Sequence, residues 1–296
     1  MSYSEKRSKF VKCQNKPSWV KNGNFFQDKK MDEFRLDLLK IQFFCNNFTK
    51  TPIPQKISEN WDIIDATHHV NFYSEGNFFK GQWLSKAFPF LLTQDGKDFT
   101  EANNRSYRAI ALRHKPTFLI SIFTAGTDCF DNVIADGKLY TRSRIARDYC
   151  HAGELFTYYI RDTYLGGEYP SIFIAHSLGC SFNMWMNGIT GGNAYILNTD
   201  AFCGSEFSHQ QAWERFQTIP PHVNNIDSII GSPSFLNNYG QEHVGHLCKL
   251  ETYKKKWLHR ILDSSPVTKP VSFGIQSLKS HSIENIAHAY EKKLRK

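Results

Sequence analysis

The sequence contains no run of the roughly 18 uncharged apolar residues that a helix needs to cross a bilayer. Its first residues, MSYSEKRSKFVKCQNKPSW, also lack the apolar core of a cleaved signal peptide. By the usual targeting routes we therefore expect a cytoplasmic protein. Secretion by a route without a cleaved signal stays open.

Paired cysteines, repeats and linkers are equally absent. The seven cysteines are scattered and form no C-x-x-C pair, which argues against the common zinc and redox motifs. We expect reduced and mostly buried thiols. No internal repeat and no Ser/Gly-rich linker marks a second domain.

The composition is that of a chain able to form one large core. It has 296 residues, of which 41% are hydrophobic and 15% aromatic. The net charge of +8 and the pI near 9.0 would suit an anionic partner. The basic clusters YKKKW (253–257) and EKKLRK (291–296) belong to no nucleic-acid motif. We expect mainly solubilising charge and no nucleic-acid binding, while peripheral contact with an anionic membrane stays open.

The chain divides into a short arm and one domain. Residues 1–28 are polar, basic and aperiodic, and we expect a partly disordered arm there. Residues 29–296 are expected to form a single domain. Within it, residues 29–105 begin with a helix over MDEFRLDLLKIQFFCNNF (31–48) and form an N-terminal layer or lid. The aromatic stretch 77–92 would line a substrate groove, act as a flap over the site, or pack against the sheet.

From residue 107 onward, segments with the hydrophobic pattern of strands are followed in turn by segments with the hydrophobic pattern of helices. Apolar runs bounded by turn residues predict strands, and runs with one apolar face predict helices. A β-α-β-α-β order of this kind indicates an α/β fold with a mostly parallel sheet and helices on both faces. The expected strands are 107–113, 117–123, 171–175 and 194–198, and the expected helices are 141–167 and 178–189.

The stretch SIFIAHSLGC (171–180) combines the end of a buried strand with the start of a helix. Ser177 would lie on the sharp turn between them, and its small neighbours Ala175 and Gly179 match a relaxed G-x-S-x-G pattern. The amide of Leu178 would then point at a developing oxyanion. The alternative is that Ser177 is an ordinary helix N-cap. Cys180 is interpreted as a core residue of the helix.

The run AHSLGC resembles the GHSLGG elbow of class 3 lipases, a branch of the α/β-hydrolase fold. Upstream, FLISIFTAGTDCFDNVIADGK (118–138) is similar to that family's strand and Gly-Thr loop, which precedes the serine by about fifty residues. The resemblance implies that Thr127 supplies the second oxyanion donor beside Leu178. Ala125 stands where the family usually carries an arginine.

Two downstream segments are also similar to that family. NNIDSIIGSPSFLNNYGQEHVGH (224–246) resembles the segment in which a strand ends in the catalytic acid, and this implies Asp227. SLKSHSIENIAHAY (277–290) resembles the loop and closing helix that carry the base, and this implies His281. The resemblance spans roughly residues 105–290 and implies a triad of Ser177, Asp227 and His281, with no metal or organic cofactor.

Other residues compete for the same roles. Asp200 follows an apolar strand as well, and we interpret it as a turn or cap residue. His288 lies two helical turns beyond His281, and we interpret it as a surface or packing residue. His176, next to the serine, is interpreted as structural or as part of the substrate lining.

A metal site is the remaining alternative. His243 and His246 are three residues apart, but the intervening Gly245 favours a loop over a helix. We therefore favour the lipase-like interpretation of this segment. The further ligands considered are Glu242, His209 and His222.

The expected function is hydrolysis of a carboxylic ester of a lipid, an acylglycerol or a phospholipid acyl ester, through an acyl-enzyme. The alternative is a non-catalytic hydrolase-fold protein that binds a partner or a membrane surface. Transfer of the acyl group to an acceptor other than water stays open too, because the same residues would carry it.

Overall fold

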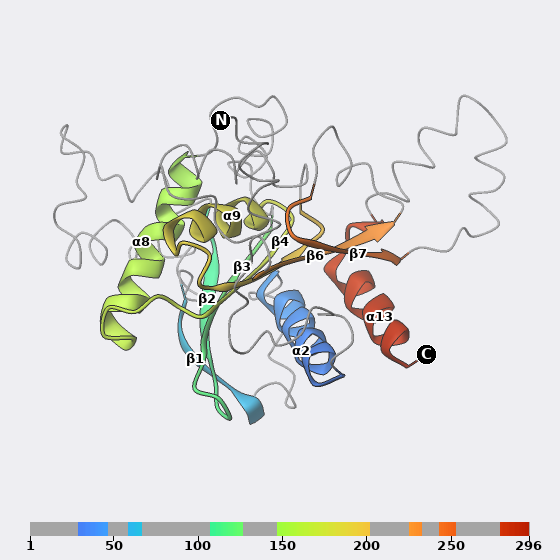
Figure 1. Cartoon of the computed structure of the whole chain (residues 1–296), viewed down its shortest axis with the longest axis horizontal. Helices are drawn as coiled ribbons and strands as arrows, with labels where there is room; N and C mark the ends of the chain where they lie inside the picture. The colour runs from blue at the N-terminus through green and yellow to red at the C-terminus, as the bar shows by residue number, and fades with distance from the viewer. Residues whose placement is uncertain are drawn as a thin grey trace, which may run out of the picture.

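The computed structural model describes residues 29–46, 59–66, 107–126, 147–201, 225–232, 243–252 and 279–295. Its centre is a seven-stranded sheet in which the strands follow one another in space in the order of the chain (Figure 1). The strands are β1 (Trp61–Ala66), β2 (Ala109–His114), β3 (Ile120–Thr124), β4 (Ile172–His176), β5 (Tyr195–Thr199), β6 (Ile226–Ser232) and β7 (His246–Glu251).

The sheet is mostly parallel. Strands β3 to β7 run in one direction, whereas β1, β2 and β3 pair antiparallel. A tight turn at His114 to Leu119 joins β2 to β3, and the amide of Phe118 closes it by donating to the carbonyl of His114. The four strands expected between residues 107 and 198 are confirmed, while β1 and β7 were not predicted from the sequence.

Helices cover both faces of the sheet (Figure 1). The helices α8 (Arg147–Tyr164) and α9 (Gly179–Ile189) lie on one face, and α2 (Lys29–Asn46) and α13 (Ile283–Leu294) lie on the other. Successive residues of a strand point to opposite faces, and the two cores divide accordingly. The α8/α9 core takes Ala109, Ala111, Phe173 and Ile196, and the α2/α13 core takes Ile110, Leu112, Ile172, Ile174 and Leu197.

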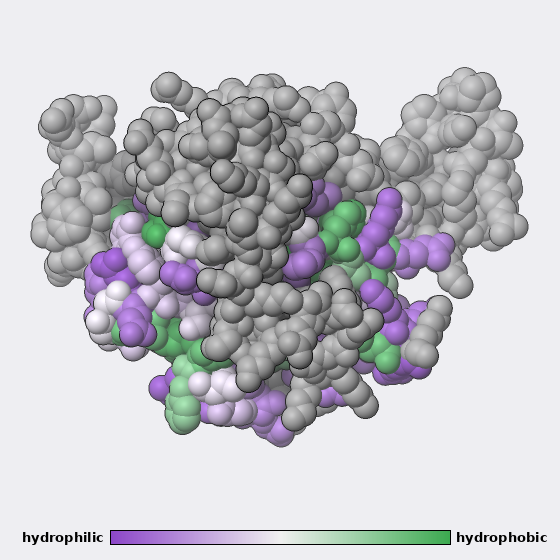
Figure 2. Space-filling view, viewed as in Figure 1, coloured by the Kyte–Doolittle hydropathy of each residue, from purple (hydrophilic) through white to green (hydrophobic). Residues whose placement is uncertain are grey.

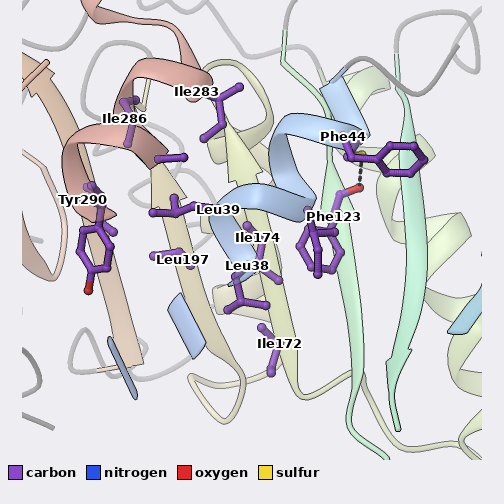
Figure 3. Close-up of a cluster of buried hydrophobic side chains, with 14 of the residues drawn as sticks. Leu38, Leu39, Phe44, Phe123, Ile172, Ile174, Leu197, Ile283, Ile286 and Tyr290 are labelled. Carbon is purple, nitrogen blue, oxygen red and sulfur yellow. Dashed lines mark hydrogen bonds between the residues drawn. The ribbon is translucent and has the colours of Figure 1, made fainter. Parts of the chain in front are cut away.

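The helix α2 contributes much of the second core. Leu38, Leu39 and Ile41 are fully buried, and Figure 3 shows Leu38 and Leu39 directed toward β4 and β5. Burying a side chain of this kind stabilises the fold by about 1.5–3 kcal/mol. Its C-terminal end is tied to β3 by the thiol of Cys45, which donates to the carbonyl of Phe123 at 3.3 Å. The helix expected over 31–48 is thus confirmed, shifted by two residues at each end.

The helix α9 is buried almost all round, as the predicted apolar run requires. Its Phe182 packs edge-on against Tyr107 and Phe173. Cys180 is fully buried in this helix, which confirms its interpretation as a core residue. Gly153 of α8 faces the Phe182 ring of α9. A side chain at position 153 would overlap this ring, so it would push the two helices apart.

None of the helices within the described ranges is long and apolar enough to span a membrane. On the face shown in Figure 2, hydrophobic groups of the described residues occur in separate areas between hydrophilic ones. The expected arm (1–28) and the aromatic stretch (77–92) lie outside the described residues, so both stay predictions.

Candidate active site

Ser177 lies on the turn between β4 and α9 with a backbone φ of 53°. A positive φ is uncommon for a residue with a side chain and costs of order 1–3 kcal/mol. The turn is held by the Ser177 amide, which donates to the carbonyl of Thr199 at 3.0 Å, and by the Cys180 amide, which donates to the carbonyl of Ser177 at 3.1 Å. The N-cap of α9 is Leu178, and the Ser177 hydroxyl lies 2.7 Å from the ring of His281, a contact that the ordinary N-cap interpretation of the serine does not explain.

Small residues around the turn allow this conformation. A Cβ on Gly179 would lie 2.8 Å from the carbonyl oxygen of Ala125 and 3.0 Å from Thr124, closer than real side chains approach. A Cβ on Gly126 would lie 3.2 Å from the Cβ of Ser177. Ala175 is an ordinary buried strand residue, so its methyl group is compatible with the elbow.

His281 is the imidazole that reaches the serine. Its Nε2 lies 2.7 Å from Ser177 Oγ, and the histidine directly precedes Ser282, the N-cap of α13. The ring is nearly buried, with 13% of its side chain exposed. The predicted meeting of Ser177 and His281 is therefore confirmed as geometry. His288 is exposed on α13, as the sequence indicated.

The carboxylate beside His281 belongs to Asp200. Its Oδ2 lies 2.9 Å from His281 Nδ1, within ion-pair distance although the two atoms are not aligned as an ideal hydrogen bond. Its Oδ1 accepts a hydrogen bond of 2.7 Å from the amide of Gly231, and the side chain is fully buried. Asp200 directly follows β5 and has a φ of 50°, so the carboxyl ends of β4 and β5 bring the acid and the serine to one edge of the sheet.

Asp227 does not meet His281, and its prediction as the acid is wrong. It is the second residue of β6, so it lies near the start of that strand and not at its carboxyl end. Its Oδ2 accepts hydrogen bonds from Arg35 Nε at 3.0 Å and from the Tyr195 hydroxyl at 2.8 Å. Burial raises the pKa of Asp227 to about 7, against the lowering effect of Arg35. Asp227 therefore belongs to a polar network beneath α2.

The sequence pattern also indicated Asp200 as a candidate acid, but the resemblance to the lipase family favoured Asp227. Asp200 follows the run AYILN, which predicts the next strand after the strand of Ser177. Neighbouring parallel strands end at the same edge, so this pattern is compatible with the two side chains lying close together. The amide of Asp200 donates to the carbonyl of Ile229 in β6 at 2.8 Å, so this bond continues the pairing of β5 with β6 and does not support the turn or cap role assigned to Asp200.

His176 is buried behind the triad. Its Nε2 lies 2.7 Å from the carbonyl oxygen of His281, and its Nδ1 lies 2.9 Å from Asn46 Nδ2. Burial, together with the neighbouring His281, lowers the pKa of His176 to about 4, so the ring is neutral near pH 7. Of the two roles considered for His176, the contacts support the structural one.

Of the two expected oxyanion donors, Leu178 lies within the described residues. It is the N-cap of α9, and within the described part of the chain no acceptor is assigned to its amide, so its role stays a prediction. Thr127 lies outside the described residues, so its role stays a prediction. The preceding amide, that of Gly126, is engaged by Asn46 Oδ1 at 3.3 Å and is not the second donor.

Three of these side chains could also form a metal centre. His176, Asp200 and His281 offer ligand atoms within 4.8 Å of one another. However, both ring nitrogens of His176 face other partners, and His281 lies between Ser177 and Asp200. These contacts suit proton transfer better than metal ligation. No other such cluster occurs among the residues that the structure describes, and Glu242, His209 and His222 lie outside them.

Comparison with protein-family models, with curated proteins and with solved structures found no match to this chain. The case for a function therefore depends on the geometry of Ser177, His281 and Asp200 and on the sequence resemblance described above.

Proposed function

We propose that this protein is a serine hydrolase of the α/β-hydrolase type that cleaves carboxylic esters of lipids through an acyl-enzyme. The observation that carries the proposal is the continuous contact from Ser177 Oγ to His281 Nε2 at 2.7 Å and from His281 Nδ1 to Asp200 Oδ2 at 2.9 Å. The strained backbone of Ser177 supports it, because such strain occurs where a nucleophile must be exposed at a strand-to-helix turn.

The first step is attack on the ester. Ser177 Oγ bonds to the carbonyl carbon while His281 Nε2 accepts the hydroxyl proton. When the tetrahedral intermediate collapses, the carbon–oxygen bond to the alcohol breaks and the imidazolium returns its proton to that alcohol. Water then attacks the acyl-enzyme by the same route and releases the acid. Asp200 keeps the Nδ1–H tautomer and stabilises the imidazolium.

The negative oxygen of the intermediate needs preorganised donors. The Leu178 amide at the start of α9 is one, and we propose the Thr127 amide as the other. Each donor of this kind lowers the barrier by about 3 kcal/mol. The reaction needs no metal or organic cofactor, because the serine, imidazole and amides supply all its groups.

A lipid substrate is favoured by the resemblance of AHSLGC to the class 3 lipase elbow. The basic net charge of +8 would help such an enzyme at an anionic membrane surface. An acylglycerol and a phospholipid acyl ester share the same scissile group, and both are included in the proposal.

The test uses purified full-length protein, a fluorophosphonate probe and p-nitrophenyl esters of increasing acyl length. We expect one adduct, on Ser177, and a rate that rises with acyl length. The Ser177→Ala variant should lose the adduct and roughly a million-fold in kcat. Ser181→Ala is the matched control, because Ser181 is a buried serine four residues along whose hydroxyl has no hydrogen-bond partner among the residues that the structure describes.

Two outcomes would contradict the proposal. Equal rates for the wild-type and Ser177→Ala proteins would remove the serine mechanism. A folded wild-type protein that forms no adduct and hydrolyses no ester would favour the non-catalytic binding protein instead.

A further inference from the structure

We propose that His176 is a positioning residue that holds the main chain of His281 in place and couples it, through Asn46, to the segment that leads into the expected oxyanion loop. The inference rests on the proposed function, in which His281 is the base and His176 takes no proton.

The direction of each hydrogen bond follows from what the partners can do. The His281 carbonyl only accepts, so His176 Nε2 carries the hydrogen and donates to it at 2.7 Å. His176 Nδ1 therefore accepts, and the Asn46 amide nitrogen donates to it at 2.9 Å. One neutral tautomer of His176 satisfies both contacts.

The orientation of the Asn46 amide is set by its own partners. Asn46 Oδ1 accepts from Gln42 Nε2 at 3.0 Å and from the Gly126 amide at 3.3 Å, which leaves Nδ2 facing His176. Gln42 also donates to the carbonyl of Thr124 at 2.8 Å. The last turns of α2 are thereby bonded to the end of β3 and, through His176, to the loop that carries the base.

Histidine suits this position because it is rigid and has a donor at one end and an acceptor at the other. The residue is 7% exposed, and its ring centroid lies 5.0 Å from that of His281. A second proton on the ring would place an N–H against the Asn46 amide, so the surroundings select the neutral form. The low pKa of His176 agrees with this.

Losing the contact should misplace the base. The imidazole of His281 must stay within hydrogen-bond distance of Ser177 Oγ, and a shift of about 1 Å can lower a rate about 100-fold. His176 contacts the main chain of His281 and not the reacting atoms. We therefore expect its effect to appear in kcat and not in KM.

The experiment compares His176→Leu, which removes the donor, with His176→Gln, which keeps an N–H able to reach the same carbonyl. His176→Leu should lower kcat about 100-fold with KM within twofold, and His176→Gln should recover kcat to within about tenfold of wild type. Thr157→Val is the control, because it removes another buried hydrogen bond, from Thr157 to the Gly153 carbonyl at 2.8 Å, inside α8. It should leave kcat unchanged.

A second readout does not need turnover. In protein labelled with ¹³C at the histidine rings, the His281 signal should shift in His176→Leu and return toward its wild-type position in His176→Gln. If His176→Leu does not fold, Asn46→Ala, which removes only the outer partner, should still shift that signal and lower kcat about tenfold.

The inference is overturned if folded His176→Leu keeps kcat within twofold and an unmoved His281 signal, or if His176→Gln fails to recover either. If the wild-type protein itself shows no turnover and no fluorophosphonate adduct, the proposed function fails, and the His281 signal alone decides whether His176 positions that residue.

Discussion

At the scale of single residues, two buried aspartates of neighbouring strands have different tasks. Asp200 faces a histidine that gains a proton during the proposed reaction, whereas Asp227 faces Arg35, which is charged at all times. Both carboxylates are fully buried, so burial alone does not distinguish them. What distinguishes them is the partner of each carboxylate, a histidine for Asp200 and an arginine for Asp227.

Asp200→Asn should lower kcat about 10,000-fold while the fold is retained. The asparagine amide can present an N–H to His281 Nδ1, which favours the wrong tautomer and leaves the imidazolium without a counter-charge. Hydrolysis of a p-nitrophenyl ester and a urea unfolding curve would measure the two effects. Wild-type activity in Asp200→Asn would contradict the triad as the structure assigns it.

Asp227→Asn should instead destabilise the protein by about 1.5–3 kcal/mol. The substitution removes the carboxylate that Arg35 Nε contacts at 3.0 Å, while Asp32, at 2.8 Å from Arg35 Nη1, stays as a counter-charge of the fully buried guanidinium. The loss would appear as a lower urea midpoint, with kcat of the remaining folded protein near wild type. A variant of normal stability that has lost activity would return Asp227 to the catalytic role that the sequence suggested.

At the scale of elements, the turn from β4 to α9 depends on close packing against the end of β3. The helix starts directly at Gly179, whose α-carbon faces the carbonyls of Thr124 and Ala125. The elbow can therefore keep Ser177 in its strained conformation only while these two segments stay in contact.

Gly179→Ala should reduce the rate of fluorophosphonate labelling by at least about tenfold. Alanine is favoured over glycine in helices by about 1 kcal/mol, but its Cβ would lie 2.8 Å from backbone oxygen, which cannot move without shifting β3 or α9. Ser181→Ala in the same helix should label at the wild-type rate. Unchanged labelling of Gly179→Ala would show that the elbow tolerates this shift.

At the scale of the whole molecule, helix α2 links distant parts of the chain. Its Arg35 reaches Asp227 of β6, Asp32 accepts a hydrogen bond from Tyr290 of α13, and Asn46 reaches His176 of β4. A helix from the N-terminal third thus supports both the core and the site, and stability and activity should respond together when α2 is disturbed.

The stability of the whole protein should depend on pH through His176. Its folded pKa of about 4 lies below the ordinary value of 6.5, so the unfolded chain binds a proton that the folded chain does not. The contribution is complete above pH 6.5 and is lost as the pH falls toward 4, by roughly 3 kcal/mol in total.

The measurement is the difference in unfolding free energy between wild type and His176→Gln at several pH values. Glutamine does not titrate in this range. As the pH falls from 6.5 to 4, the unfolding free energy of the wild type should therefore fall relative to that of His176→Gln, while the contributions of the other titratable groups cancel in the difference. A constant difference over that range would mean that the pKa of His176 is the same in the folded and the unfolded protein.

Much of the architecture could be predicted from the sequence because strands and helices each have a characteristic local pattern of hydrophobic residues. The strand and helix patterns between residues 107 and 198 specify the parallel order, and the small residues around Ser177 specify the elbow. The strands β1 and β7 were not predicted because apolar and polar residues alternate only weakly in these two segments. In β7 the buried face carries apolar Cys248 and Leu250, but the exposed face mixes Leu247 with Lys249 and Glu251, so the apolar–polar alternation of the sequence is broken.

The sequence by itself determined the α/β class, the nucleophile candidate and the base candidate, since each depends on short-range pattern or on a motif of adjacent residues. Only the tertiary structure decided which aspartate meets His281 and what His176 bonds to. Those choices depend on which strand ends share an edge and on contacts between residues more than 100 positions apart, such as His176 with Asn46 and with His281. Local pattern carries no information about such distances.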